Sequence, residues 1–315
     1  MPEATDGPLV SVVTPVFNGE AFLEECIRSV IAQTYRHWEY IIVNNCSTDR
    51  SLAIAASLAE REPRIRILDN QQFLGATDNA NHALRQISLE SKYCKILHAD
   101  DWLLPRCLEE MIAVTESHTT VGIVGSYRIR GTQVMPSGLP PGVTVIAGRE
   151  ACRMNLLNGP YTFGTPSAHL FRSDIVHSRV PFYDEYHIAE DVDACFNIMR
   201  DWDFGFVHQI LVYQRLHDDS ITSRHARLRP ANAQGLYMLD KYAPHYLSDD
   251  ERRCVEARLL KNYYRVLGRE LLFGGRAADF WDYHRSAFQR TGRRLSRPRI
   301  LAGAAVSGLK RLLGS

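Results

Sequence analysis

The fold is decided early in the chain, by Leu9-Val-Ser-Val-Val-Thr14 and by a second apolar run, Glu39-Tyr-Ile-Ile-Val-Asn44. Between the two runs, apolar residues from Phe22 to Ile31 recur at the spacing of a helix, so that one helix face packs on the neighbouring strands. Short apolar runs that alternate with helical segments are typical of βαβ units and of a mainly parallel sheet. We therefore expect an α/β fold.

The same alternation continues along the chain to about Tyr127 and predicts three further strands. It gives a doubly wound sheet, mainly parallel, with helices on both faces. Ser47, Thr48 and Asp49 are candidates for the N-cap of the helix after the second strand. Gly and Pro are frequent in residues 131–148, where we expect a surface loop. The further strands are predicted at Arg64–Leu68, Tyr93–His98 and Val121–Tyr127.

The last third of the chain has a helical pattern instead. Ser248 and Glu251 have the spacing of a capping box, and Gly274 is placed to end the helix that follows. We predict a catalytic domain over residues 1–223 and a helical C-terminal extension over residues 224–315.

The composition limits the partners and the cellular location that can be expected. The net charge of +1 gives no reason to expect a nucleic-acid partner. Seven scattered cysteines without a Cys-x-x-Cys pair fit reduced thiols, so we expect a cytoplasmic protein. Residues 1–8 lack the pattern of a signal peptide, and no apolar run has the length of a membrane span.

Polar clusters follow three of the predicted strands. In doubly wound folds ligands bind at the carboxyl ends of the strands, so these clusters are the first indication of a binding site. They read Thr14-Pro-Val-Phe-Asn18, Asn44-Asn-Cys-Ser-Thr-Asp49 and His98-Ala-Asp-Asp101.

Asp100 and Asp101 are neighbouring hard oxygen ligands, as Mg²⁺ or Mn²⁺ bound to a diphosphate requires. A solvated loop or a helix cap would also explain the pair. A second pair, Glu190 and Asp191, opens a helix, where carboxylates either compensate the helix dipole or serve as a rigidly held base. The meaning of Arg215 and His217, after a further apolar run, is open in the same way: they either neutralise phosphate or are ordinary surface residues.

Taken together, these clusters resemble the family 2 glycosyltransferases, whose catalytic domain has the GT-A fold. The resemblance runs from about Val10 to Ser223. It rests on Val10-Ser-Val-Val-Thr-Pro-Val-Phe-Asn18, Ser29-Val-Ile-Ala-Gln-Thr-Tyr35, Ile41-Ile-Val-Asn-Asn-Cys-Ser-Thr-Asp49, Gly75-Ala, Asn79, Ala99-Asp-Asp-Trp-Leu-Leu-Pro105, Phe182-Tyr-Asp-Glu185, Glu190-Asp191 and Tyr213-Gln-Arg-Leu-His217.

The resemblance implies an inverting glycosyltransferase that takes a sugar from a nucleotide diphosphate donor, UDP-sugars being favoured, with Mn²⁺ or Mg²⁺ as cofactor. Asp191 would be the base, with Glu190 beside it, and Asp100 and Asp101 would bind the metal. The acceptor would be a hydroxyl of a glycan or lipid-linked glycan, as in polysaccharide biosynthesis. Donor-binding positions would be Thr14, Pro15, Asn18, Asn45, Asp49, Gly75, Asp100, Arg215 and His217.

The chain departs from the family pattern at some of these positions. Asn44 and Asn45 stand where the family usually has two acids, and His98 stands where it has another. An Asn45 oxygen can still accept from a pyrimidine N–H while its amide donates to a neighbouring carbonyl. His98 is either a metal or phosphate partner or a core residue.

Two other functions remain open on the sequence. A nucleotidyltransferase would carry a Gly-rich basic loop after the first strand, where this chain has Pro15-Val-Phe-Asn-Gly19. A silent nucleotide-sugar-binding module would keep the fold without turnover.

The tail has its own pattern. No acid follows Asp282, and Leu301, Ala305, Leu309, Leu312 and Leu313 can form one helical stripe. The stripe predicts either docking on an anionic membrane surface, with the protein peripheral on the cytoplasmic face, or docking on the protein itself. The basic residues of this region are Arg285, Arg290, Arg293, Arg294, Arg297, Arg299, Lys310 and Arg311.

Overall fold

The computed structural model describes residues 7–135, 137–158, 162–184, 189–218, 220, 223, 226–274 and 278–312. The chain forms two compact units. The first contains Met1–Cys152 and Pro160–Leu216, and the second contains Arg153–Gly159 and His217–Ser315. The division into a catalytic domain up to residue 223 and an extension after it stays a prediction.

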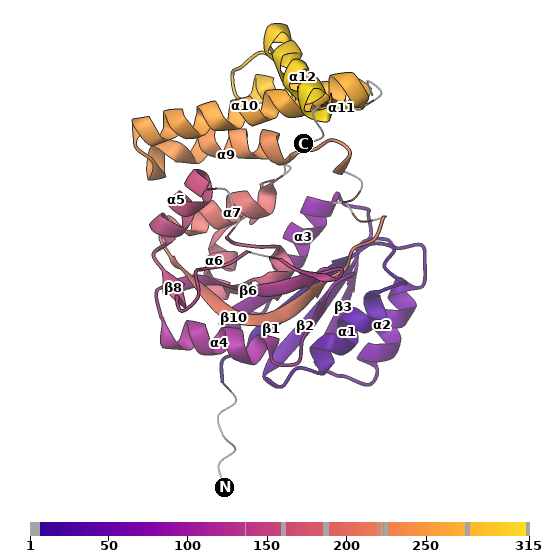
Figure 1. Ribbon diagram of the computed structural model, residues 1–315. Helices are drawn as coiled ribbons and strands as arrows, with labels where there is room; N and C mark the ends of the chain where they lie inside the picture. The colour runs from indigo at the N-terminus through magenta and orange to yellow at the C-terminus, as the bar shows by residue number, and fades with distance from the viewer. Residues whose placement is uncertain are drawn as a thin grey trace. The chain divides into compact units, whose positions relative to one another are not determined.

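The first unit carries the strands and most of the shorter helices (Figure 1). Its strands are β1 Val10–Val16, β2 Trp38–Asn44, β3 Ile65–Asp69, β4 Tyr93–Ile96, β5 Trp102–Leu103, β6 Val121–Arg130, β7 Gln133–Val134, β8 Val145–Ile146, β9 Leu170–Arg172 and β10 Asp203–Gln214. Its helices are α1 Leu23–Ile31, α2 Ser51–Ala59, α3 Ala76–Leu84, α4 Cys107–Ser117, α6 Ser173–Ser178 and α7 Glu190–Ile198, with a short 3-10 helix, η1, at Pro166–Ala168; α5, Gly148–Asn158, crosses between the units.

Among the described residues the strands form one sheet in the order β3-β2-β1-β4-β9-β6-β10-β5. The pairs β1–β2, β2–β3, β1–β4 and β6–β10 are parallel, whereas β9 and β5 pair antiparallel with their neighbours. The predicted α/β fold with a mainly parallel sheet is thus confirmed. The sequence did not reveal β9, because three residues are too short to show a strand period.

The order of the strands fixes where a ligand can bind. The chain moves outward from β1 to β2 and β3, and then returns to place β4 on the other side of β1. The carboxyl ends of β1 and β4 therefore lie at a topological switch point, where doubly wound sheets open a crevice. The loops Phe17–Asn18 and His98–Asp101 leave the sheet there.

Helices cover both faces of this sheet, with α1, α2 and α4 on one side and α3, α6 and α7 on the other (Figure 1). Helix α1 has one apolar face that packs on the sheet, formed by the buried residues Leu23, Cys26, Ile27 and Val30. Glu24 and Glu25 lie in its first turn, where negative charges interact favourably with the helix dipole. Strand residues such as Val12 and Ile41 are fully buried, as a sheet covered on both faces requires.

Two local predictions need correction. The N-cap of α2 is Arg50, not one of Ser47, Thr48 and Asp49; the Asp49 carboxylate nevertheless accepts the backbone N–H of Ser51 at 2.9 Å. The predicted loop at 131–148 contains the two-residue strands β7 and β8, which pair with β6 and β10. Pairing with a longer neighbouring strand can stabilise segments too short to be read from their own sequence.

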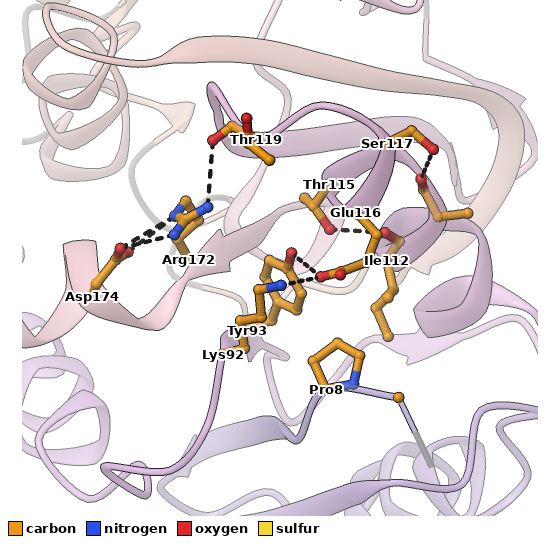
Figure 2. A network of polar contacts seen from close by, with 12 residues as sticks. Pro8, Lys92, Tyr93, Ile112, Thr115, Glu116, Ser117, Thr119, Arg172 and Asp174 are labelled. Atoms are coloured by element: carbon orange, nitrogen blue, oxygen red, sulfur yellow. Dashed lines mark hydrogen bonds and ion pairs between the residues drawn. The ribbon is translucent and has the colours of Figure 1, made fainter. Parts of the chain in front are cut away.

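A polar network holds β4 at its amino end, opposite to the ligand-binding edge (Figure 2). Tyr93 Oη donates to Glu116 of α4 at 2.5 Å, and the Lys92 ammonium lies 2.7 Å from the same carboxylate. Arg172 of β9 pairs with Asp174 of α6 at 3.0 Å. The strand that leads into the acidic loop is thereby anchored to a helix at its start.

The second unit is helical, with α9 Ala231–Tyr246, α10 Asp249–Phe273, α11 Ala278–Arg290 and α12 Arg297–Leu312. The predicted capping box at Ser248 and Glu251 is present, and Gly274 is the C-cap of α10. Helices α10 and α12 cross closely: a Cβ at Gly303 would lie 2.1 Å from the carbonyl oxygen of Tyr264, so only glycine fits there. The core of this unit contains Tyr263, Leu267, Phe280 and Phe288.

In the described parts of the chain, no helix combines the length and the hydropathy that a membrane span requires.

Candidate donor and metal site

The loops after β1 and β2 are fastened to each other through Asn18 and Asp49. Asn18 has a positive φ of 50°, which asparagine tolerates better than most residues. Its backbone N–H donates to Ser47 Oγ at 2.9 Å, and its Oδ1 accepts the Thr48 N–H at 2.8 Å. Asp49 accepts the N–H of Glu20 with its second oxygen at 2.9 Å. Both predicted donor-binding residues thus hold the loops after β1 and β2 together.

The charge of Asp49 is stabilised by these contacts. Burial alone would raise the pKa of its carboxyl group, but the hydrogen bonds from the Ser51 side chain and from the Glu20 and Ser51 N–H groups outweigh that effect and lower the pKa. Asp49 therefore stays ionised while it ties the loop after β1 to the start of α2.

Asn45 is held in the loop that precedes α3. Its Nδ2 donates to the Leu74 carbonyl at 2.8 Å, as expected for an amide that replaces an acid. Its Oδ1, however, accepts the Leu74 N–H at 2.9 Å and Asn70 Nδ2 at 3.1 Å. An amide oxygen has two lone pairs, so a nucleotide base could reach this oxygen only by displacing one of these donors.

Three other predicted donor positions lie nearby. Thr14 is fully buried, and its hydroxyl donates to the Leu97 carbonyl at 2.8 Å and lies 2.9 Å from Tyr40 Oη. Its side chain thus joins β1 to the loop after β4. Pro15 is partly exposed on β1, and Gly75 is exposed as the N-cap of α3.

The loop after β4 gathers His98, Asp100 and Asp101. Ligand atoms of the three side chains lie within 4.8 Å of one another, and each of them could bind a metal ion. His98 is only half-buried and lies beside the two acids, and its contact with metal or phosphate stays a prediction. Two carboxylates and an imidazole form a suitable donor set for a divalent cation.

Asp101 is the most constrained member of this group. It is 2% exposed, and burial raises the pKa of its carboxyl group to about 6; the nearby Asp100 charge acts in the same direction. The charge of His98, a hydrogen bond from Ser167 and the backbone N–H of Arg215 oppose this rise. A buried anion of this kind gains stability from any cation that binds beside it.

Arg215 is brought to the same loop by β10. Strand β5 pairs with β10, Tyr213 lies opposite Trp102, and their rings stack with centroids 3.7 Å apart. The Arg215 Nε donates to the Asp100 carbonyl at 3.1 Å. Its guanidinium lies over the rings of Phe22 and Trp102, at 4.4 and 4.8 Å from their centroids, and pairs with Glu25.

The second acid pair lies at the start of α7. Asp191 Oδ1 accepts the N–H of Val192 at 2.8 Å, and the buried residues Cys195, Phe196 and Ile198 anchor the helix. Burial raises the pKa of both Glu190 and Asp191, whereas the charge of His98 lowers both. The charge of His98 lowers the pKa of Asp101 in the same way.

His217 belongs to the second unit, where its carbonyl accepts the hydroxyl of Ser223 at 2.7 Å. Its contact with phosphate stays a prediction. Glu185, part of the family-like stretch that begins at Phe182, lies outside the described residues.

Several residues of the site were not predicted from the sequence. Phe17 and Phe73 are 49% and 60% exposed, and their rings meet edge to face with centroids 4.9 Å apart, next to the loop of Asn45. Exposed aromatic residues in loops at a ligand-binding edge could have been noticed. Ser167 accepts the N–H of His98 across 69 positions of sequence, and no local pattern indicated this contact.

Comparison with known proteins agrees with this geometry. The model of a family described as glycosyl transferase family 2 matches residues 11–179. EpsE of Bacillus subtilis (strain 168), named as a glycosyltransferase, is 28% identical over 232 residues, which cover 66% of this chain and 82% of EpsE.

Two solved structures share the fold. TarS residues 1–349 of S. aureus, in complex with UDP, superposes with a TM-score of 0.65 at 15% identity, covering 97% of this chain and 92% of that one. The mannosyltransferase PcManGT of Pyrobaculum calidifontis, in complex with GDP-Man and Mn²⁺, gives a TM-score of 0.57 at 16% identity and covers 97% and 87%. Because the family model spans more than half of the chain, we conclude that this protein belongs to glycosyl transferase family 2 and is a glycosyltransferase with the GT-A fold.

Proposed function

We propose that the protein transfers a sugar from a UDP-sugar to a hydroxyl of a glycan or lipid-linked glycan, with inversion at the anomeric carbon. The observation that carries the proposal is the grouping of His98, Asp100 and Asp101 at the switch point. These acids could hold a diphosphate through a cation, and Asp191, at the start of α7, could receive a proton.

In the proposed reaction the acceptor oxygen attacks the anomeric carbon, and the bond from that carbon to the diphosphate oxygen breaks. Asp191 takes the proton of the attacking hydroxyl. Its raised pKa makes it a better base than an ordinary carboxylate, because proton affinity and pKa rise together. One base that acts opposite the leaving group gives inversion.

A divalent cation, when bound, would neutralise the charge that collects on the departing diphosphate. His98, Asp100 and Asp101 fit Mn²⁺ or Mg²⁺, and diphosphate oxygens would supply further ligands. Arg215 adds a positive charge at the same loop, where its guanidinium is already held by Phe22, Trp102 and Glu25. We propose that it faces the diphosphate.

The preference for a uracil base draws support from the TarS complex with UDP, whose fold this chain shares. Phe17 and Phe73 offer an exposed aromatic surface on which a base could stack. With the Asn45 amide engaged in its loop, we propose that backbone groups and stacking, more than Asn45, select the base.

We further propose that the protein works in polysaccharide biosynthesis, at the cytoplasmic face of a membrane. None of its seven cysteines, all of which lie in the described parts of the chain, forms a disulfide, and this fits a reducing compartment. Helix α12 packs on α10 through Ile300, Gly303 and Ala304, whereas Leu301 and Val306 are 61% and 38% exposed. The exposed residues Arg294, Arg297 and Arg299 complement anionic lipid.

Titration calorimetry with UDP, GDP and dTDP, with and without Mn²⁺, tests the proposal. We expect UDP to bind most tightly, Mn²⁺ to strengthen it, and Asp100→Ala to remove that gain. Hydrolysis of UDP-sugars with Mn²⁺, measured next, separates an enzyme from a silent binding module. Equal affinity for UDP in Mn²⁺ and in excess EDTA would contradict the metal assignment.

A further inference from the structure

Lys95 is a fully buried lysine in the middle of β4. Its neighbours on the strand are buried as well, and its aliphatic stem leads to α4, where Nζ lies 3.7 Å from Met111 Sδ. Removing an ammonium group from water is costly, and an apolar residue of the same length would fill this space without that cost. The lysine therefore needs a reason to be there.

The reason lies in what its ammonium holds. Nζ donates to the carbonyl of Ser167 at 2.7 Å and to the carbonyl of His169 at 3.0 Å. These two carbonyls belong to the turn around η1, which comes more than seventy residues later in the sequence. Inside the turn, the N–H of Ala168 donates to the Thr165 carbonyl at 2.8 Å, and that of His169 donates to the Pro166 carbonyl at 3.0 Å.

The turn brings one side chain, that of Ser167, to the loop His98–Asp101. The fully buried Ser167 hydroxyl accepts the backbone N–H of His98 at 3.2 Å, and its hydrogen bond to Asp101 lowers the pKa of that carboxyl group. One hydroxyl thus contacts both ends of the segment that contains the proposed metal ligands. Its position depends on the height of the turn above β4, which Lys95 sets.

We propose that Lys95 is a positioning residue: it fixes the turn at residues 167–169 so that the Ser167 hydroxyl orients Asp101 and His98 for metal and diphosphate binding. The inference rests on the proposed function. It adds a buried chain of contacts that runs from Lys95 on β4, through the turn at residues 167–169, to Asp101 in the loop after β4. Burial lowers the pKa of the Lys95 ammonium, and the Asp101 charge opposes that effect only in part.

Lys95 does not contact substrate in this arrangement, because its side chain is wholly inside the protein. Its effect must therefore pass through Ser167. Groups that orient metal ligands typically change metal affinity about 10- to 100-fold when they are removed. A lysine that served only to fill the core would change stability and leave the affinity as it is.

The test measures Mn²⁺ affinity in the presence of UDP by calorimetry, and the melting temperature of the same preparations. We expect Lys95→Met, which keeps length and removes the donors, to weaken Mn²⁺ binding about 10- to 100-fold. Ser167→Ala should give a similar loss. The double variant should lose little more than the larger single loss, because both residues act in one chain of contacts.

Tyr93→Phe is the matched control. Tyr93 lies on the same strand two residues earlier, so its side chain points to the same face, and its hydroxyl contacts α4 at the far end of the strand (Figure 2). Removing that hydroxyl should lower the melting temperature and leave Mn²⁺ affinity unchanged.

Wild-type affinity in Ser167→Ala would overturn the inference, even if Lys95→Met did not fold. Strictly additive losses in the double variant would overturn it as well. If the wild-type protein bound neither UDP nor Mn²⁺, the proposed function would fail first, and the chain of contacts would have no ligand to position.

Discussion

The backbone N–H of Arg215 donates a hydrogen bond of 3.0 Å to Oδ1 of Asp101, although 114 positions of sequence separate the two residues. The bond joins the end of β10 to the loop after β4. Its donor is a backbone N–H group, so it does not depend on which side chain stands at position 215. Asp101 therefore keeps one structural partner when its side chain is changed to another acceptor. That makes it a suitable position at which to separate stability from ligand binding.

We expect Asp101→Asn to stabilise the metal-free protein while it abolishes tight Mn²⁺ binding. The pKa of Asp101 is raised in the fold to about 6 from 3.8, so the folded state disfavours the ionised form. The penalty is absent below pH ~4, where folded and unfolded chains both carry the proton, and it is complete above pH ~6. The free energy of unfolding of the variant should exceed that of wild type by about 1–3 kcal/mol above pH ~6, and the two should be equal below pH ~4.

Calorimetric melting of both proteins in EDTA, at pH ~4 and at pH ~7.5, measures this difference. An Asn variant that melts lower than wild type at the higher pH would show that Asp101 makes favourable interactions in its ionised state. The raised pKa of Asp101 would then not correspond to a loss of folding stability in the metal-free protein.

Asp191→Asn should leave the fold and UDP affinity nearly intact and reduce sugar transfer. Asn keeps the size of the side chain and can still accept the N–H of Val192, but it cannot take a proton. Loss of a general base costs on the order of a hundred- to ten-thousand-fold in rate. Transfer rate and UDP affinity should be measured in one preparation. Unchanged transfer would remove the base assignment, and lost UDP binding would move Asp191 to the donor side.

Phe17→Ala and Phe73→Ala should each weaken UDP binding, because the two exposed rings offer the aromatic surface beside the crevice. Stacking of a base on an aromatic side chain contributes about 1–3 kcal/mol. Leu89→Ala is the control: Leu89 is 87% exposed and lies before β4, at the other edge of the sheet. Fluorescence or calorimetric titration with UDP reports the effect. Equal affinities in all three variants would place the base elsewhere.

Leu301→Asp combined with Val306→Asp should reduce sedimentation of the protein with anionic vesicles at low salt. Both side chains are exposed on α12, away from the residues that pack on α10, so the helix should keep its place. Apolar side chains of this size contribute about 1.5–3 kcal/mol each when buried, so partitioning should fall tenfold or more. Vesicles of neutral lipid provide the comparison. Equal sedimentation of wild type and variant would rule out α12 as the membrane contact.

The sequence was sufficient for the longer strands of the sheet because these are apolar runs. The predicted segments at Glu39–Asn44 and Val121–Tyr127 lie within β2 and β6, since burial on both faces leaves an unbroken apolar pattern. Strand β9 could not be predicted, because it is held by neighbours on both sides and contributes only three residues.

Only part of the candidate site could be predicted from the sequence. Asp100 and Asp101 could be identified because acids directly after an apolar strand must lie at the sheet edge. Ser167 could not, because its contact with the N–H of His98 spans 69 positions and depends on where a turn comes to rest. The burial that raises the pKa of Asp101 is likewise a property of the packed protein, which no local pattern encodes.

Strand β4 contains only four residues, from Tyr93 to Ile96, and it carries a fixed contact at each end. Because side chains alternate between faces, inserting or deleting one residue would turn every later side chain to the opposite face. Lys95 would then point away from the Ser167 turn, or Tyr93 would lose Glu116. We therefore expect that exchanging Cys94 or Ile96 for another apolar residue is tolerated far better than any change in the length of this strand. A single-residue deletion here should abolish activity although every acidic residue is retained.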